Sequence, residues 1–220
     1  MAVFDCDGTL IDSQASIIAS MVQAFESHTQ PRPAAEAVRR VVGLPLGEAI
    51  GRLLPDAPEE DHARIETSYI DAFRGLRQKG EVKDPLFPGA LEILETLEDL
   101  GWLLGVATGK GSRGLRATLE THGLMGRFAT LQTADSGPGK PNPDMLLNAM
   151  NETGADPSHT VMIGDTTFDM EMAINAGTMA IGVSWGYHPL KHLQSAGAHA
   201  VIDEFAELPE KIETVGRSPN

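Results

Sequence analysis

The hydrophobic pattern changes character along the chain. A short apolar run at residues 2–5 predicts a buried strand, whereas residues 13–82 show helical spacing almost throughout. In the first helix of this block one apolar stripe consists of Ile17, Ile18, Met21, Val22 and Phe25. Ser13 stands where an N-cap residue is expected. Prolines and glycines divide the rest of the block into predicted helices at 34–42, 46–54 and 58–78.

From Asp84 onward, short apolar strands alternate with amphipathic helices. The first of these helices carries an apolar stripe made of Ala90, Ile93, Leu94, Leu97 and Leu100. Strands are predicted at 102–107, 128–132, 160–164, 179–183 and 199–202. This alternation predicts a parallel sheet covered by helices on both faces. The strand at 2–5 is expected to join the sheet, because a lone strand leaves its backbone groups unpaired.

The predicted fold is therefore α/β, a doubly wound parallel-sheet (Rossmann-like) core with an inserted helical unit. We assign residues 1–13 and 83–220 to the core and residues 14–82 to the insertion. The chain crosses between the two near residues 12–15 and again near residues 80–86. Two such crossings predict a hinge.

Composition and charge indicate a globular protein and argue against several classes of partner. The chain has 220 residues, 41% of them hydrophobic, which suits a globular fold with a real core. No apolar run approaches the ~20 residues of a membrane span, and no signal peptide is expected before the opening strand. With 31 acidic and 17 basic residues, the net charge is −14. We therefore expect neither nucleic acid nor a membrane as a partner. Composition and charge do not determine the oligomeric state, so a monomer is the default expectation.

Cysteine and histidine usage gives no sign of disulfides or zinc. Cys6 is the single cysteine, so an intrachain disulfide is impossible and a cytoplasmic location is expected. Its side chain is expected to be a small buried hydrophobe in the sheet. The seven histidines are scattered without zinc-binding spacing.

Four polar segments follow or adjoin predicted strands. They are Asp5–Leu10 (DCDGTL), Thr108–Lys110 (TGK), Gly139–Pro143 (GKPNP) and Gly164–Asp169 (GDTTFD). In doubly wound sheets ligands bind outside the carboxyl ends of the strands. We therefore expect these segments to converge on one site.

The acidic residues of these segments predict a cation site. We expect the four carboxylates of Asp5, Asp7, Asp165 and Asp169 to gather at one sheet edge. Such carboxylates repel one another unless a cation neutralises them. An all-oxygen ligand set favours a hard ion, and Mg²⁺ is the usual choice beside phosphate.

The other polar groups of the segments suit a phosphoryl group. Lys140 supplies a positive charge fixed by neighbouring prolines, and Thr108 supplies a hydroxyl. The turn after Asp7 supplies backbone N–H groups at Gly8 and Thr9. Taken singly, each residue has an ordinary structural interpretation, such as a capping hydroxyl or a solvated lysine. Four segments at one sheet edge favour a site.

In order and spacing, the four segments resemble the motifs of the haloacid dehalogenase-like superfamily of phosphohydrolases. Residues 5–9 match its DxDGT motif, Thr108 its Ser/Thr motif, Lys140 its lysine motif, and residues 164–169 its GDxxxD motif. The insertion looks like the small α-helical cap of subfamily IA. The DGTLxDS run at residues 7–13 and the chain length look most like the phosphoglycolate phosphatase branch.

The resemblance implies a role for each matching residue. Asp5 would be the nucleophile that becomes an aspartyl-phosphate, and Asp7 the general acid and then the general base. Mg²⁺ would be held by the Asp5 carboxylate, the Asp7 backbone carbonyl and Asp165, with Asp169 assisting directly or through a water. The residues expected to bind the phosphoryl group are Gly8, Thr9, Thr108, Gly109 and Lys140, of which Thr108 and Lys140 also neutralise developing charge.

The implied activity is Mg²⁺-dependent hydrolysis of a small phosphorylated metabolite, phosphoglycolate-like or a sugar phosphate. One alternative is a phosphotransferase or isomerase of the β-phosphoglucomutase type. C–Cl cleavage is disfavoured by Asp7 and by the GDxxxD acids. A catalytically silent regulatory protein on the same fold is disfavoured because Asp5 and Lys140 are both present.

Residues outside the motifs receive more ordinary assignments. The loop at residues 43–46, between two predicted helices, is expected to face the site. Trp185 and Tyr187 are expected to pack at the domain edge, and Lys110 to support its loop.

Overall fold

The fold is known from a computed structural model that describes residues 1–216. Residues 217–220, the end of the predicted core segment, lie outside the described part. Six parallel strands form one sheet in the order β3-β2-β1-β4-β5-β6. They are β1 (Ala2–Phe4), β2 (Leu104–Ala107), β3 (Thr130–Gln132), β4 (Val161–Gly164), β5 (Met179–Val183) and β6 (Ala200–Ile202). Every predicted strand is confirmed, and β1 is central.

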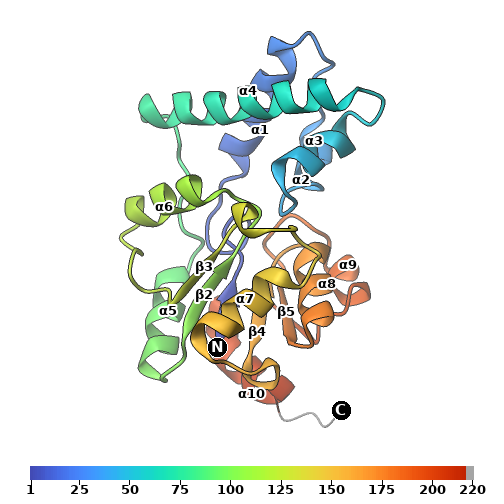
Figure 1. The fold of residues 1–220 in the computed structure, drawn as a ribbon. Helices are drawn as coiled ribbons and strands as arrows, with labels where there is room; N and C mark the ends of the chain where they lie inside the picture. The colour runs from blue at the N-terminus through green and yellow to red at the C-terminus, as the bar shows by residue number, and fades with distance from the viewer. Residues whose placement is uncertain (217–220) are drawn as a thin grey trace.

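Helices cover both faces of the sheet, as predicted (Figure 1). The helices of the core are α5 (Ala90–Asp99), α6 (Ser112–Thr121), α7 (Asp144–Thr153), α8 (Thr167–Ala176), α9 (Leu190–Ser195) and α10 (Leu208–Gly216). Successive strand residues point to opposite faces. Phe4 packs in a core with residues of α5, α6 and α10, whereas Val3 packs in a second core with residues of α7, α8 and α9.

One detail of the predicted apolar stripes is wrong. Leu100 lies beyond the end of α5 and is 61% exposed. Gly101 follows in the left-handed region with φ +80°, which turns the chain away from the helix axis. The rest of that stripe is buried.

Four helices between β1 and α5 form a separate layer. They are α1 (Gln14–Ser27), α2 (Ala35–Arg39), α3 (Leu46–Leu53) and α4 (Glu59–Gln78), and they lie together at one end of the sheet (Figure 1). This helical unit has its own hydrophobic core, which includes Ile17, Met21, Phe25, Val38, Ile50 and Ile65. Among the described residues, no helix is long and apolar enough to cross a membrane.

The two chain crossings between the helical unit and the sheet lie side by side. Ile11 and Leu86 form an antiparallel bridge, and the Asp12 N–H donates to the Pro85 carbonyl at 2.8 Å. One turn into α1, the Ser16 hydroxyl donates to Asp84 Oδ1 at 2.6 Å. The crossings are therefore joined by main-chain and side-chain hydrogen bonds.

The helical unit also contacts the core through the loop between α2 and α3. A Cβ atom built on Gly109 would lie 2.6 Å from the Gly43 carbonyl oxygen, so the two loops touch at a position where only glycine fits. Phe168 of α8 packs against Val41 and Leu44 of the same loop region. The loop at residues 43–46 thus lies over the carboxyl end of the sheet, as the sequence predicts.

Candidate active site

The topology brings three predicted segments together. Asp5 follows β1, Thr108 follows β2 and Asp165 follows β4, and β2 and β4 flank β1. The Asp5 N–H extends the ladder by donating to the Ile163 carbonyl at 2.9 Å. Parallel strands place their carboxyl ends at one edge, and the direction of chain winding reverses at β1. The predicted convergence of these segments is confirmed.

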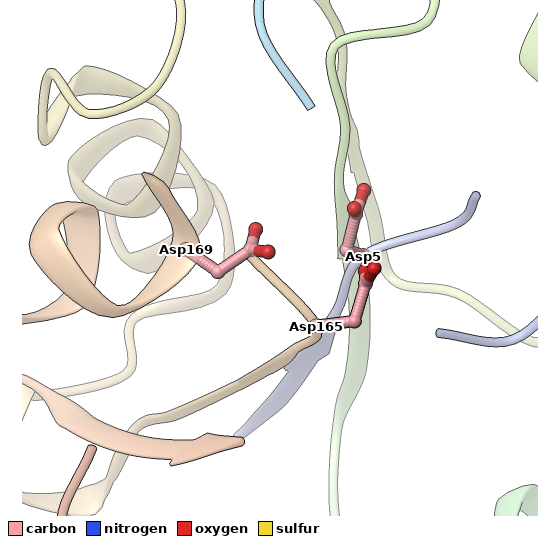
Figure 2. A group of neighbouring side chains, drawn as sticks. All are labelled: Asp5, Asp165 and Asp169. Carbon is pink, nitrogen blue, oxygen red and sulfur yellow. The ribbon is translucent and has the colours of Figure 1, made fainter. Parts of the chain in front are cut away.

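Three aspartates form a buried cluster at this edge. One carboxylate oxygen from each of Asp5, Asp165 and Asp169 lies within 4.8 Å of the others (Figure 2). Asp5 and Asp165 come from strand ends, and Asp169 comes from the first turn of α8. Their exposure is 1% for Asp5 and 0% for the other two. Three buried acids this close require a positive charge between them.

Lys140 supplies part of that charge. Its side chain is fully buried, with Nζ 2.9 Å from Asp5 Oδ1 and 2.6 Å from Asp169 Oδ1. Burial alone would lower the pKa of Lys140, but Asp169 and Asp5 outweigh it and raise the pKa above its ordinary value. The lysine therefore stays protonated and bridges two of the three acids. The alternative of a solvated surface lysine is wrong.

One lysine leaves the cluster negative. Burial, opposed by Lys140, raises the pKa of Asp5 to about 7. Burial and the nearby charges of Asp5 and Asp169 raise the pKa of Asp165 well above its ordinary value. Among the described residues, buried Asp5 Oδ2 has no hydrogen-bond partner. An unpartnered carboxylate oxygen in an oxygen-rich, negatively charged cluster fits a hard divalent cation.

The carboxylates of the cluster are oriented by hydrogen bonds. Asp165 accepts from the Thr9 hydroxyl at 2.9 Å and from the Tyr187 N–H at 2.8 Å. Asp169 Oδ2 accepts from the Thr166 N–H at 3.0 Å and from the Thr166 hydroxyl at 2.7 Å, within the capping box that starts α8. The acids are thereby held in fixed orientations.

Asp7 lies apart from this cluster. Its Oδ1 accepts from the Ser13 hydroxyl at 2.5 Å and lies 3.0 Å from Lys110 Nζ. The Asp7 carboxylate faces the same cavity as Asp5, but it is not part of the three-acid cluster, because Ser13 and Lys110 hold it separately. Ser13 makes no side-chain hydrogen bond to the start of α1, so its predicted capping role is also wrong.

Gly8 does not have the predicted free N–H. Its amide donates to the Ile11 carbonyl at 2.9 Å, which closes the turn after Asp7. Its φ is +89°, and a Cβ atom there would lie 2.4 Å from Asp165 Oδ2. Glycine is required here for its backbone conformation and for the close approach of Asp165. The predicted contact of Gly8 with a phosphoryl group stays a prediction.

The acid cluster opens into a cavity of about 930 Å³. Asp5, Asp7 and Thr108–Lys110 line it on the sheet side, and α1, α4 and the loop between α2 and α3 line it on the other. Thr108 is buried, and its hydroxyl accepts from the Lys110 N–H at 3.3 Å. The cavity thus joins Asp5, Asp7 and the helical unit.

Sequence reasoning missed three residues of the site. Lys110 pairs with Asp7, Ser13 donates to Asp7, and the backbone of Tyr187 donates to Asp165. Lys110 stands two residues after Thr108 and Ser13 ends the DGTLxDS run, so the sequence held a signal for both. Cys6 is buried within the sheet core, as predicted.

Comparison with known proteins agrees with this geometry. The family model for haloacid dehalogenase-like hydrolases matches residues 2–183. The chain is 35% identical over 209 residues to "Probable phosphatase IndB" of Dickeya dadantii, covering 94% of this chain and 91% of that protein. It is 30% identical to "Phosphoglycolate phosphatase" of Vibrio parahaemolyticus, with 96% and 95% covered.

Among solved structures, a hydrolase from Pseudomonas syringae superposes with a TM-score of 0.85. It is 27% identical, and the match covers 97% of each chain. The chain therefore belongs to the haloacid dehalogenase-like hydrolase family, among its phosphatases.

Proposed function

We propose that this enzyme hydrolyses the phosphate monoester of a small metabolite, with Mg²⁺ as cofactor and Asp5 as nucleophile. The observation that carries the proposal is the buried cluster of Asp5, Asp165 and Asp169, with Lys140 between two of them, from which Asp5 reaches the wall of a large cavity. Nothing in a purely structural role requires three buried carboxylates and one lysine to meet beside a cavity.

The residues that would hold Mg²⁺ are the Asp5 and Asp165 carboxylates and the Asp7 backbone carbonyl. Asp169 would assist directly or through a water, with its oxygens also in contact with Lys140 and Thr166. A bound Mg²⁺ would neutralise phosphoryl oxygens and so allow the anionic Asp5 carboxylate to approach.

Asp5 and Asp7 are held by different partners, so the two acids can take different roles in the reaction. A carboxylate oxygen of Asp5 attacks phosphorus, and the bond to the leaving oxygen breaks as Asp7 delivers a proton to it. Asp7 then accepts a proton from the water that attacks the aspartyl-phosphate. This releases inorganic phosphate and restores Asp5. Two easier displacements replace one difficult displacement.

The phosphoryl oxygens would be bound by groups around Asp5. Thr108 offers its hydroxyl, Lys140 its ammonium, and Gly109 its backbone N–H. Thr9 would offer its backbone N–H, while its hydroxyl donates to Asp165.

Residues 14–82 would serve as the cap that covers the site, with the crossings near residues 12–15 and 80–86 as its hinge. The contact of Gly43 with Gly109 supports a closed position of the cap over the site.

Phosphate release from a metabolite panel, with and without Mg²⁺, tests the proposal. Asp5→Asn should reduce turnover by at least 10³-fold while its circular dichroism stays unchanged, because the replacement is nearly isosteric. Asp99→Asn, a change at an exposed aspartate of α5, is the matched control and should retain full activity. Full activity of Asp5→Asn, or turnover indifferent to chelation of Mg²⁺, would refute the proposal.

A further inference from the structure

The cavity above the acid cluster has two chemically different walls. The sheet side carries Asp5, Asp7 and the polar loop Thr108–Lys110. The helical unit contributes a mainly hydrophobic wall. Its apolar lining residues include Ile17, Met21, Val42, Leu46, Tyr69 and Phe73.

The volume of the cavity exceeds what a phosphoryl group needs. Cavities of ~300–1,000 Å³ typically enclose ligands of drug size, and this one measures about 930 Å³. The phosphoryl group would occupy only the floor beside Asp5. The remaining space, bounded by the hydrophobic wall, is available to the alcohol part of the substrate.

Two aromatic rings of α4 line the cavity. Tyr69 and Phe73 are one turn apart on α4, with ring centroids 6.1 Å apart and planes tilted by 41°. Lys110 Nζ lies 5.3 Å from the centroid of the Phe73 ring and 3.0 Å from Asp7 Oδ1. The Phe73 ring is therefore linked to Asp7 through Lys110, on the cavity wall near the proposed acid.

Two of the cations that line the cavity are neutralised by carboxylates. Lys110 pairs with Asp7 (3.0 Å) and Arg74 with Asp71 (3.1 Å). Arg77 donates to the neutral Thr118 hydroxyl (3.1 Å) and lies over the Phe73 ring, 5.5 Å from its centroid. Arg113 lies exposed on α6, and Glu66 adds a negative charge to the helical wall. A second carboxylate, as in phosphoglycolate, would be desolvated against hydrophobic side chains.

We propose that the enzyme selects phosphate monoesters of alcohols that carry a hydrophobic ring, and that Tyr69 and Phe73 determine this preference. The inference rests on the proposed phosphatase function and names its substrate class. Burial of a ring against two aromatic side chains is favourable, through apolar area and through ring stacking.

Three alkyl phosphates test the inference in the full-length enzyme with Mg²⁺: 2-phenylethyl phosphate, ethyl phosphate and phosphoglycolate. All three leave as primary alkoxides, so an aryl leaving group does not bias the comparison. We expect kcat/KM for 2-phenylethyl phosphate to exceed that for each of the others by at least tenfold. Equal values, or a preference for phosphoglycolate, would overturn the inference while leaving the phosphatase function intact. Absence of phosphate release from all three would overturn both.

Substitutions on α4 test whether Tyr69 and Phe73 cause the preference for a substrate with a ring. Phe73→Leu and Tyr69→Leu remove a ring but keep apolar volume, and each should lower the ratio of kcat/KM for 2-phenylethyl over ethyl phosphate by about three- to tenfold. Leu76→Ala, at a half-buried residue of α4 that does not line the cavity, should leave the ratio unchanged. This ratio of two kcat/KM values does not depend on the fraction of enzyme that is active, because both values come from the same preparation. An unchanged ratio in both ring variants would remove these residues from the proposed role.

Discussion

Lys140 Nζ lies 2.9 Å from Asp5 Oδ1, and both side chains are buried at the centre of the sheet edge. The lysine comes from the loop before α7 and the aspartate from the end of β1, 135 residues earlier in the chain. Removal of one partner of a buried ion pair leaves the other charge desolvated, which costs more than the pair itself contributes. Lys140 is therefore needed for stability as well as for the proposed chemistry.

We predict that Lys140→Met destabilises the fold by about 3–5 kcal/mol at pH 8 without Mg²⁺, because Asp5 and Asp169 lose their shared cation. Urea denaturation followed by circular dichroism measures this loss. The control is Lys191→Met, at an exposed position on α9, which should change stability by less than about 0.5 kcal/mol. A Lys140→Met protein as stable as the parent would contradict the burial argument.

Stability should also depend on pH through Asp5. Burial raises the pKa of Asp5 from 3.8 to about 7, so the folded state binds this proton more tightly than the unfolded chain. The metal-free protein should therefore lose stability as pH rises from about 4 to about 7. Mg²⁺ binds the ionised carboxylates and should recover the stability at and above pH 7.

Melting temperatures with 5 mM Mg²⁺, in steps from pH 4.5 to 8, provide the measurement. The increment due to Mg²⁺ should grow with pH and should vanish in Asp165→Asn. A constant increment, or one that survives in that variant, would show that Mg²⁺ binds elsewhere.

The fold was predictable because the apolar runs, the helical periodicity and the positions of the motifs all indicate the same topology. The strands are short apolar runs between helices with clear periodicity, and the motif residues of β1, β2 and β4 stand at the strand ends. The proximity of Asp5 to Asp165 followed from parallel topology alone. The position of Lys140 followed only from its motif, since an isolated lysine in a loop has no hydrophobic pattern.

The errors at the site share one cause, which is competition for hydrogen bonds. From its sequence position, Ser13 could cap the helix that follows it. In the structure its hydroxyl donates to Asp7 instead. The Gly8 amide is used by the turn itself. Such choices depend on the three-dimensional positions of acceptors, which spacing along the chain does not provide.

Gly109 is predicted to control closure of the helical unit. A Cβ atom at this position would lie 2.6 Å from the Gly43 carbonyl and 2.7 Å from the Leu44 carbonyl. Gly109→Ala should force the loops apart at a cost of about 1–3 kcal/mol, and so raise KM by roughly tenfold or more. Small-angle scattering should show a larger radius of gyration.

Gly75→Ala is the matched control for closure. Gly75 lies within α4, and a Cβ atom there has nothing within 4 Å. Alanine should stabilise the helix by about 0.5–1 kcal/mol without affecting KM. Equal KM values in both alanine variants would show that the contact between the loops does not matter for substrate binding.

The hydrogen bond between Ser16 and Asp84 is predicted to stabilise the junction of the helical unit with the core. Burial raises the pKa of Asp84, and the Ser16 hydroxyl opposes that rise. Among the described residues, Asp84 Oδ2 has no hydrogen-bond partner, so Ser16→Ala would leave both buried oxygens unsatisfied. The cost should be about 1–3 kcal/mol at pH 8.

The deficit in Ser16→Ala should shrink as pH falls, because protonation of Asp84 removes the unsatisfied charge and its folded-state pKa is raised. Urea denaturation at pH 5 and pH 8 measures the change, with Ser27→Ala as the control at an exposed serine of α1. Asp84→Asn added to Ser16→Ala should recover part of the loss at pH 8, since it replaces the buried charge with a neutral amide. If the deficit were the same at both pH values and unaffected by Asp84→Asn, the serine would act through packing and not through the carboxylate.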